Sequence, residues 1–109
     1  MTTKTKRKSK TSTTIKFLDD LIGEPMSFSN LIRNIRETDD FTQASLAEKL
    51  GVSKAHICDI EKKRKFVSAE RASRFAKVLG YSEALFVRLA LQDQINEAGL
   101  KYTLHVEAA

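Results

Sequence analysis

The segment 43–62, with the sequence QASLAEKLGVSKAHICDIEK, predicts two short helices joined by a tight turn. The first helix carries Leu46, Ala47 and Leu50 on one face, as a helix that packs against a core requires. Gly51 follows directly and ends this helix, because the left-handed conformation of a helix C-cap costs about 1–2 kcal/mol for a residue with a Cβ. The glycine therefore fixes where the first helix ends and the turn begins.

The second helix begins after this short turn. Thr42 is placed to cap the first helix and Ser53 to cap the second, and Ile57 and Ile60 give the second helix a narrow apolar stripe. Two helices that cross at about 90–120° over so short a turn need a small side chain where they meet, and Ala47 occupies that place. The segment is therefore predicted to form a helix-turn-helix.

The motif is made of Thr42-Gln43, Leu46-Ala47, Gly51-Val52-Ser53 and Ile57-Cys58-Asp59-Ile60-Glu61. Over about residues 28–92 the chain resembles the lambda-repressor/Cro-like (XRE) family of DNA-binding proteins. The resemblance implies an all-α, five-helix repressor-type domain in which Arg36 makes a structural ion pair. It also implies a short loop with a glycine after the second helix, whereas this chain has Lys62-Lys63-Arg64-Lys65 there and no glycine.

Four segments are expected along the chain: a disordered basic arm at 1–14, a short extra helix and linker at 15–26, the helix-turn-helix domain at 27–98 and a C-terminal β-strand at 99–109. Serines at positions 27, 68 and 82 are placed to begin further helices within the domain. The arm either follows DNA phosphates or a minor groove, or is a solvated tail.

The last helix of the domain is apolar on two sides. Leu85, Phe86, Leu89 and Ala90 can enter the core of the monomer, while a second set of apolar residues lies on another side. In a small chain the simplest partner for this second side is another copy of the chain. The predicted dimer interface consists of Val87, Leu91, Ile95, Tyr102 and Leu104.

Residues 100–107 alternate apolar and polar side chains with a period of two, which predicts a strand. No second strand is evident in the sequence. A lone strand leaves its backbone groups unpaired. The strand is therefore expected to pair with its symmetry mate, to pair with a partner protein, or not to form.

The net charge of +5 is unevenly distributed. Of the 19 basic side chains, six lie within residues 1–16, where there is no acidic residue, which leaves 13 to face all 14 acidic side chains. The case for DNA binding therefore rests on a local cluster, formed by Lys54, Lys62, Lys63, Arg64, Lys65, Arg71 and Arg74.

The family resemblance assigns DNA contacts position by position. The base-contacting positions are Ser53, Lys54, Ala55, His56 and Asp59. The phosphate-contacting positions are Gln43, Lys62, Lys63, Arg64 and Lys65. Lys54 suits guanine O6 and N7, and Asp59 suits cytosine N4, although Asp59 has the alternative of pairing with Lys62 or Lys63.

No catalytic site, metal site or cofactor is expected. His56 and His105 lie on different elements, Cys58 is the single cysteine and is expected to be half-buried, and no glycine-rich phosphate loop is present. Without a long apolar run or a signal peptide, the chain is expected to be cytoplasmic and not to bind membranes.

The sequence thus predicts a homodimeric repressor that binds a palindromic operator in double-stranded DNA. The small size and the unpaired terminal strand make the chain similar to HigA-type antitoxins, which implies a RelE-like toxin as partner and repression of its own operon. Two alternatives remain open. One is a stand-alone phage-type or chromosomal repressor, and the other is a protein interaction module that does not bind DNA.

Overall fold

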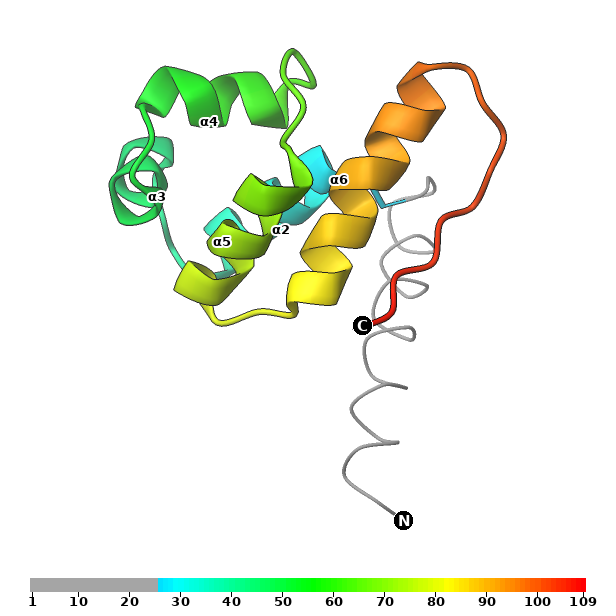
Figure 1. Ribbon diagram of the computed structural model, residues 1–109. Coiled ribbons are helices and arrows are strands. Elements are labelled where there is room, and N and C mark those ends of the chain that lie inside the picture. The colour runs from blue at the N-terminus through cyan, green and yellow to red at the C-terminus, as the bar shows by residue number, and fades with distance from the viewer. Residues whose placement is uncertain (1–25) are drawn as a thin grey trace.

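The computed structural model describes residues 26–109, which fold into a bundle of five helices (Figure 1). The helices are α2 (Phe28–Thr38), α3 (Gln43–Leu50), α4 (Lys54–Glu61), α5 (Ala69–Leu79) and α6 (Glu83–Glu97). The predicted all-α domain and its helix boundaries are confirmed. The expected basic arm at 1–14 and the helix at 15–26 lie outside the described residues, apart from Met26.

Every described helix begins with a hydroxyl side chain that accepts a backbone N–H three residues further on, so that one donor of the first turn is satisfied. These N-caps are Ser27, Thr42, Ser53, Ser68 and Ser82. Thr42 also forms a capping box, because the backbone N–H of Thr42 donates to Ser45 Oγ at 2.8 Å. The sequence predicted each of these caps from a serine or threonine before an apolar stripe.

The five helices also end alike, in a Schellman turn that carries one residue with positive φ. The left-handed residues are Asp40, Gly51, Lys63, Gly80 and Gly99. Glycine takes this conformation without steric cost, and aspartate is among the residues that tolerate it. Lysine is not, so the turn after α4 is the one whose residue type is unexpected.

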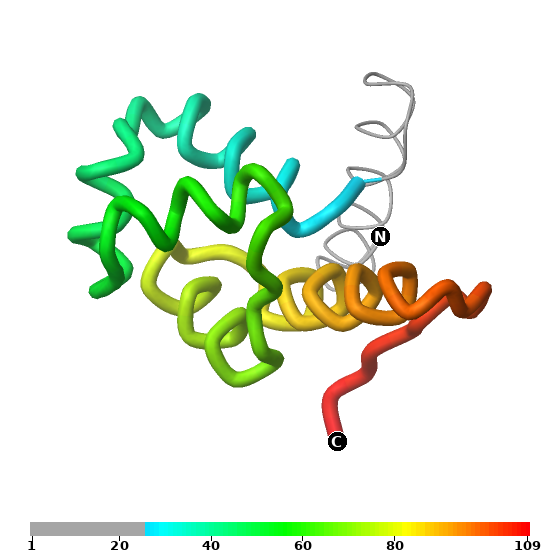
Figure 2. Tube along the Cα trace, turned by 90° about the horizontal axis from the view of Figure 1, so that it is seen from above, coloured from blue at the N-terminus to red at the C-terminus, as the bar shows by residue number. Residues whose placement is uncertain are grey.

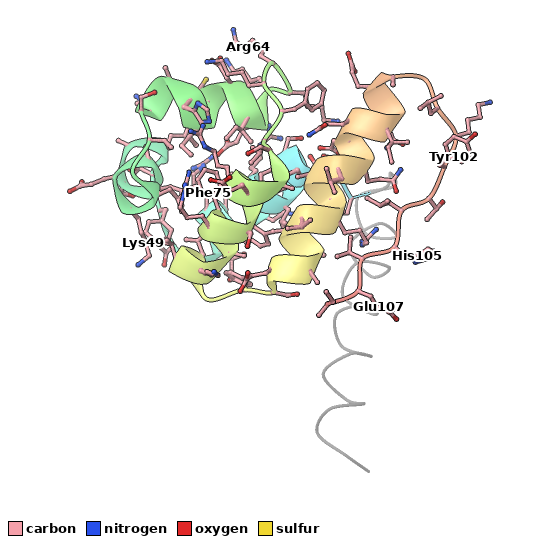
Figure 3. The ribbon with its side chains drawn as sticks, in the orientation of Figure 1. Lys49, Arg64, Phe75, Tyr102, His105 and Glu107 are labelled. Atoms are coloured by element: carbon pink, nitrogen blue, oxygen red, sulfur yellow. The ribbon has the colours of Figure 1, made fainter. Side chains whose placement is uncertain are left out.

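The core is built from the inward faces of all five helices. Phe75, which lies at the centre of the domain in Figure 3, and Phe86 are among its largest fully buried side chains. Phe28 packs edge-on against Phe86, with ring centroids 5.8 Å apart. The expected inward residues of α2 and the small residue Ala47 between α3 and α4 are buried as predicted. Figure 2 shows α6, the longest described helix, running along one side of the domain and away from α3 and α4.

A buried carboxylate joins α2, α3 and α4. Glu61, the last residue of α4, is 4% exposed. Its two oxygens accept from Arg36 Nε at 2.7 Å and Nη2 at 3.2 Å, and Gln43 Nε2 donates to Oε1 at 3.2 Å. Arg33 Nη2 donates to the backbone carbonyl of Glu61 at 2.9 Å, and its Nε lies 3.7 Å from Oε1. The structural ion pair expected of Arg36 is confirmed.

A second carboxylate fastens α6 to the start of α2. Asp93 Oδ2 accepts the backbone N–H of Phe28 at 3.0 Å. Burial raises the pKa of this carboxyl, while the bond from Phe28 and the charge of Lys63 act in the opposite direction. The bond satisfies a donor in the first turn of α2 that the cap residue Ser27 does not reach.

The predicted strand at 99–109 does not form in the single chain. Residues 100–109 have no helix or strand, and within residues 26–109 there is no second strand with which they could pair. The segment instead turns back along α6 (Figure 1), where the side chain of Gln92 binds the backbone of Tyr102 and Leu104. The physical reason is that a strand without a neighbouring strand gains no backbone hydrogen bonds from its extended conformation.

The second apolar side of α6 is partly covered by this same segment. Leu91 and Ile95 line an apolar groove together with Leu100 and Leu104. Val87, also expected at the dimer interface, is half-buried and packs against the core of the monomer. The chain's own C-terminal segment is therefore one partner of this side of α6, which the sequence analysis had assigned to a second copy.

Substituting Arg36→Ala is predicted to lower the free energy of unfolding by about 3–5 kcal/mol, because it leaves the buried Glu61 carboxylate without its bidentate partner. Arg33→Ala is the matched control: its side chain is 44% exposed, and it removes one hydrogen bond to the carbonyl of Glu61 while the carboxylate keeps Arg36, so its loss should cost only about 1–2 kcal/mol. Urea unfolding followed by circular dichroism measures both. If both variants lost the same free energy of unfolding, Arg36 would not be the main partner of the buried carboxylate.

Candidate nucleic-acid interface

The first turn of α4 presents small and basic side chains to solvent. Ser53, Lys54 and Ala55 are exposed, whereas Ile57 is fully buried against the core. Ser53 Oγ accepts the backbone N–H of His56 at 3.1 Å, which leaves the hydroxyl proton for another acceptor. In Figure 1, α4 lies at the outer edge of the domain. A helix exposed in this way at its N-terminal turn has the shape that enters a major groove.

His56 is half-buried and contacts α5. Its Nε2 lies 3.1 Å from Nη1 of Arg71. Because a guanidinium only donates, Nε2 is the acceptor and the ring proton sits on Nδ1. Burial, followed by the charges of Arg71 and Lys65, lowers the pKa of His56 from its usual 6.5, against a smaller opposite effect of Asp59. His56 is thus neutral at pH 7 and holds Arg71 beside α4.

Asp59 is engaged by the loop that follows α4. Its carboxylate lies 3.4 Å from Nε of Arg64 and 3.8 Å from Nζ of Lys65. Its backbone carbonyl accepts the N–H of Arg64 at 2.8 Å, which closes the Schellman turn. The alternative partners considered for Asp59, Lys62 and Lys63, are not the ones it binds. Asp59 therefore orients Arg64 and Lys65.

The basic loop Lys62–Lys65 is exposed along its whole length. Lys63 has φ of 61°, and its backbone N–H donates to Ile60 O at 3.1 Å. The turn that usually takes a glycine thus forms here with a lysine, at a cost of about 1–2 kcal/mol. Lys62 and Lys63 make no salt bridge to any described residue, whereas the exposed side chain of Arg64 lies over the outer side of α4, beside Asp59 and Cys58 (Figure 3).

Gln43 is less available than expected. Its position is one of those expected to contact phosphates, yet its side-chain amide donates to the buried Glu61. Gln43 is half-buried at the start of α3, so this bond holds its side chain against the core network. A contact of Gln43 with a phosphate would have to use the second N–H of its side-chain amide or its backbone N–H.

No group of histidine, cysteine or acidic side chains able to hold a metal occurs within residues 26–109. Cys58 is half-buried, as expected, with its Sγ 3.9 Å from Nη2 of Arg64. Among the described helices none is both long and apolar enough to cross a membrane.

Comparison with protein-family models matches residues 32–86 to the family described as helix-turn-helix (HTH_3). The match covers α3 and α4 entirely, together with most of α2, all of α5 and the beginning of α6. The chain belongs to the helix-turn-helix family. Membership implies DNA binding, and the members of this family are typically regulators and not enzymes.

Searches of curated proteins and of solved structures gave no significant match to this helix-turn-helix protein. The likeness to HigA-type antitoxins therefore rests on the sequence features given above.

Two features of this helix-turn-helix protein were missed in the sequence. Arg71 was counted only as part of a charge cluster, and its bond to His56 joins positions 15 residues apart on different helices. Gln92 carried no signal, because a single glutamine on a helix is unremarkable in a sequence. The cost of a left-handed Lys63, by contrast, was foreshadowed by the missing glycine in the loop.

Substituting Lys63→Gly is predicted to leave the free energy of unfolding unchanged or to raise it by up to about 1 kcal/mol. Relief of the left-handed strain offsets the greater freedom of glycine in the unfolded chain. The same variant should bind every duplex more weakly and lower the slope of log K against log salt by about one. The control is Lys77→Ala on α5, whose lysine lies near Glu83. A stable variant with unchanged affinity would contradict the phosphate role of Lys63.

Acidification is predicted to reduce the free energy of unfolding through His56. Its pKa in the folded chain lies below the unfolded value, so the unfolded chain binds the proton more readily. This stabilisation is fully present above the unfolded pKa and is lost as the pH falls from there through the lower pKa of the folded chain. The variant His56→Gln keeps an acceptor for Arg71 without the titration. Its stability relative to wild type, measured by urea unfolding, should improve between about pH 7.5 and 5.5, and a constant difference would contradict the assignment.

Proposed function

We propose that this protein is a sequence-specific DNA-binding repressor that acts as a homodimer on a palindromic operator. The observation that carries the proposal is the pairing of two exposed features: the first turn of α4 and the cationic loop Lys62–Lys65 that immediately follows the same helix. Both belong to one rigid element, because Asp59 binds the loop and Glu61 binds the core. A helix that enters the major groove would bring the loop to the phosphates at its rim.

The proposed division of labour follows from charge and availability. Lys54 and Ala55 are exposed and contact the bases, Lys54 through guanine O6 and N7 and Ala55 through a thymine methyl. Lys62 and Lys63 contact phosphates. Arg64 and Lys65 do the same from positions set by Asp59, whose carboxylate offsets part of their charge in the free protein. Ser53 and His56 complete the surface at the start of α4.

The conformation of Lys63 supports a functional role for the loop. A residue held in a costly backbone conformation persists where something other than stability retains it. At this position glycine would satisfy the turn, and lysine adds one positive charge at the edge of the proposed DNA surface. The strain is then explained by phosphate binding.

The homodimer and the toxin partner are further parts of the proposal. A palindromic operator requires a two-fold symmetric protein, and Leu91, Ile95 and Leu104 remain only half-buried in the monomer. The narrower role, that of an antitoxin that binds a RelE-like toxin and represses its own operon, remains the prediction made from the family resemblance. A stand-alone repressor would have the same DNA surface.

Substituting Lys54→Ala is predicted to cost about 1–3 kcal/mol on the operator and to relax the preference at one base pair, with little change on random duplex. Lys54 is exposed and makes no salt bridge with a described residue, so the fold should be unaffected. Fluorescence anisotropy with the upstream DNA of the gene and a random duplex of equal length measures both affinities. The matched control is Lys63→Gly, which should weaken both duplexes alike.

Three outcomes separate the hypotheses. Equal losses of Lys54→Ala on both duplexes would contradict base reading by α4. Absence of binding to either duplex would leave the interaction module as the explanation. Addition of the product of the adjacent gene separates the two repressor roles, because only an antitoxin should change its operator binding in response.

A further inference from the structure

The side chain of Gln92 holds one edge of the C-terminal segment as a neighbouring strand would. Its Nε2 donates to Tyr102 O at 2.7 Å, and its Oε1 accepts the N–H of Leu104 at 2.8 Å. In an extended chain the C=O of one residue and the N–H of the second residue after it point to the same side. The amide of Gln92 therefore occupies the edge to which the even-numbered residues direct their backbone groups.

The opposite edge of the segment has no partner among residues 26–109. It carries the backbone groups of the odd-numbered residues, which are Lys101, Thr103, His105 and Glu107. All four residues are exposed, and His105 and Glu107 lie along the outer run of the segment in Figure 3. The segment is thus held straight on one side and left open to pairing on the other.

We propose that this open edge pairs with the same edge of a second copy, as an antiparallel two-stranded ribbon whose two-fold axis passes beside Leu104. This inference rests on the proposed homodimer and assigns its contact. In this register the numbers of two facing residues add up to 208. Lys101 therefore faces Glu107, Tyr102 faces Val106 and Thr103 faces His105 of the second copy. Leu104 faces its own symmetry mate.

The register is chosen by the chemistry of the facing pairs. Opposite charges meet in Lys101 and Glu107, and an aromatic ring meets a β-branched side chain in Tyr102 and Val106, both of which stabilise antiparallel pairs. A shift of the axis to Thr103 would place Lys101 against His105 and would leave Glu107 opposite Gly99. The segment is therefore nearly self-complementary about Leu104.

The hydrogen-bonding geometry agrees with this register. The odd-numbered residues direct their N–H and C=O groups to the open edge, so Lys101 with Glu107 and Thr103 with His105 become the hydrogen-bonded pairs. The even-numbered residues become the non-hydrogen-bonded pairs, in which side chains lie closest. The apolar side chains Tyr102 and Leu104 thus meet their partners where contact is tightest.

The surface beneath the ribbon would also gain from a second copy. Leu91, Ile95 and Leu104 line an apolar groove of about 280 Å³ between α6 and the segment. Leu100 is 50% exposed and Tyr102 is 68% exposed in the monomer. Pairing of two segments would bring these apolar residues of one copy beside those of the other and reduce their exposure.

Disulfide trapping tests the register directly. In a Cys58→Ser background, Leu104→Cys should give a cross-linked dimer under mild oxidation, because the two Cα atoms would lie about 4.5 Å apart. Thr103→Cys is the matched control, since its symmetry mate would lie diagonally at roughly 8 Å, beyond the reach of a disulfide. Cross-linking at 103 in preference to 104, at both positions equally, or at neither would overturn the proposal.

Exchanging the charges at positions 101 and 107 tests the strand pairing without changing a residue that lines the groove. Lys101→Glu should weaken dimerisation about 2- to 30-fold, and Lys101→Glu combined with Glu107→Lys should restore it. Sedimentation of the full chain without DNA measures the dimer. A wild-type monomer, or a double variant as weak as the single one, would overturn the pairing. Because DNA is absent, these outcomes are independent of operator binding, which is measured separately on the same protein and tests the proposed function.

Discussion

The buried carboxylate of Glu61 is the interaction on which the rest of the structure depends. It ends α4, and it receives hydrogen bonds from Arg36 on α2 and from Gln43 on α3. A buried ion pair contributes little net stability, but removal of one partner is costly, so the pair fixes position more than it adds free energy. Glu61 thereby sets how far the outer face of α4 stands from the core.

The C-terminal end of α4 also fixes the conformation of the loop that follows it. One residue of the helix, Asp59, closes the Schellman turn through its carbonyl and orients Arg64 and Lys65 through its carboxylate. This Schellman turn also holds Lys63 in a left-handed conformation. The recognition helix and the basic loop are therefore one element, anchored inside by Glu61 and shaped outside by Asp59.

Most of the fold could be predicted because residues close together in the sequence determine where each helix begins and ends. Hydroxyl caps, glycines after apolar stripes and the small Ala47 at the crossing each have a steric reason that needs no tertiary information. The sequence was less informative where the backbone of a turn or of the C-terminal segment decides the contact. The Schellman turn after α4 brings Asp59 to Arg64 and Lys65 and not to Lys62 or Lys63, and the strand expected at 99–109 met Gln92 in place of another strand. Such contacts depend on the course of the backbone, which periodicity does not encode.

The central claim is that α4 reads bases while the loop behind it holds phosphates. Amide chemical shifts of the labelled protein, titrated with the upstream DNA and then with a random duplex, test this claim most directly. Residues 62–65 should shift with both duplexes, whereas Lys54 and Ala55 should shift strongly only with the upstream DNA. Identical shifts with both duplexes, or shifts confined to a surface away from α4, would contradict it.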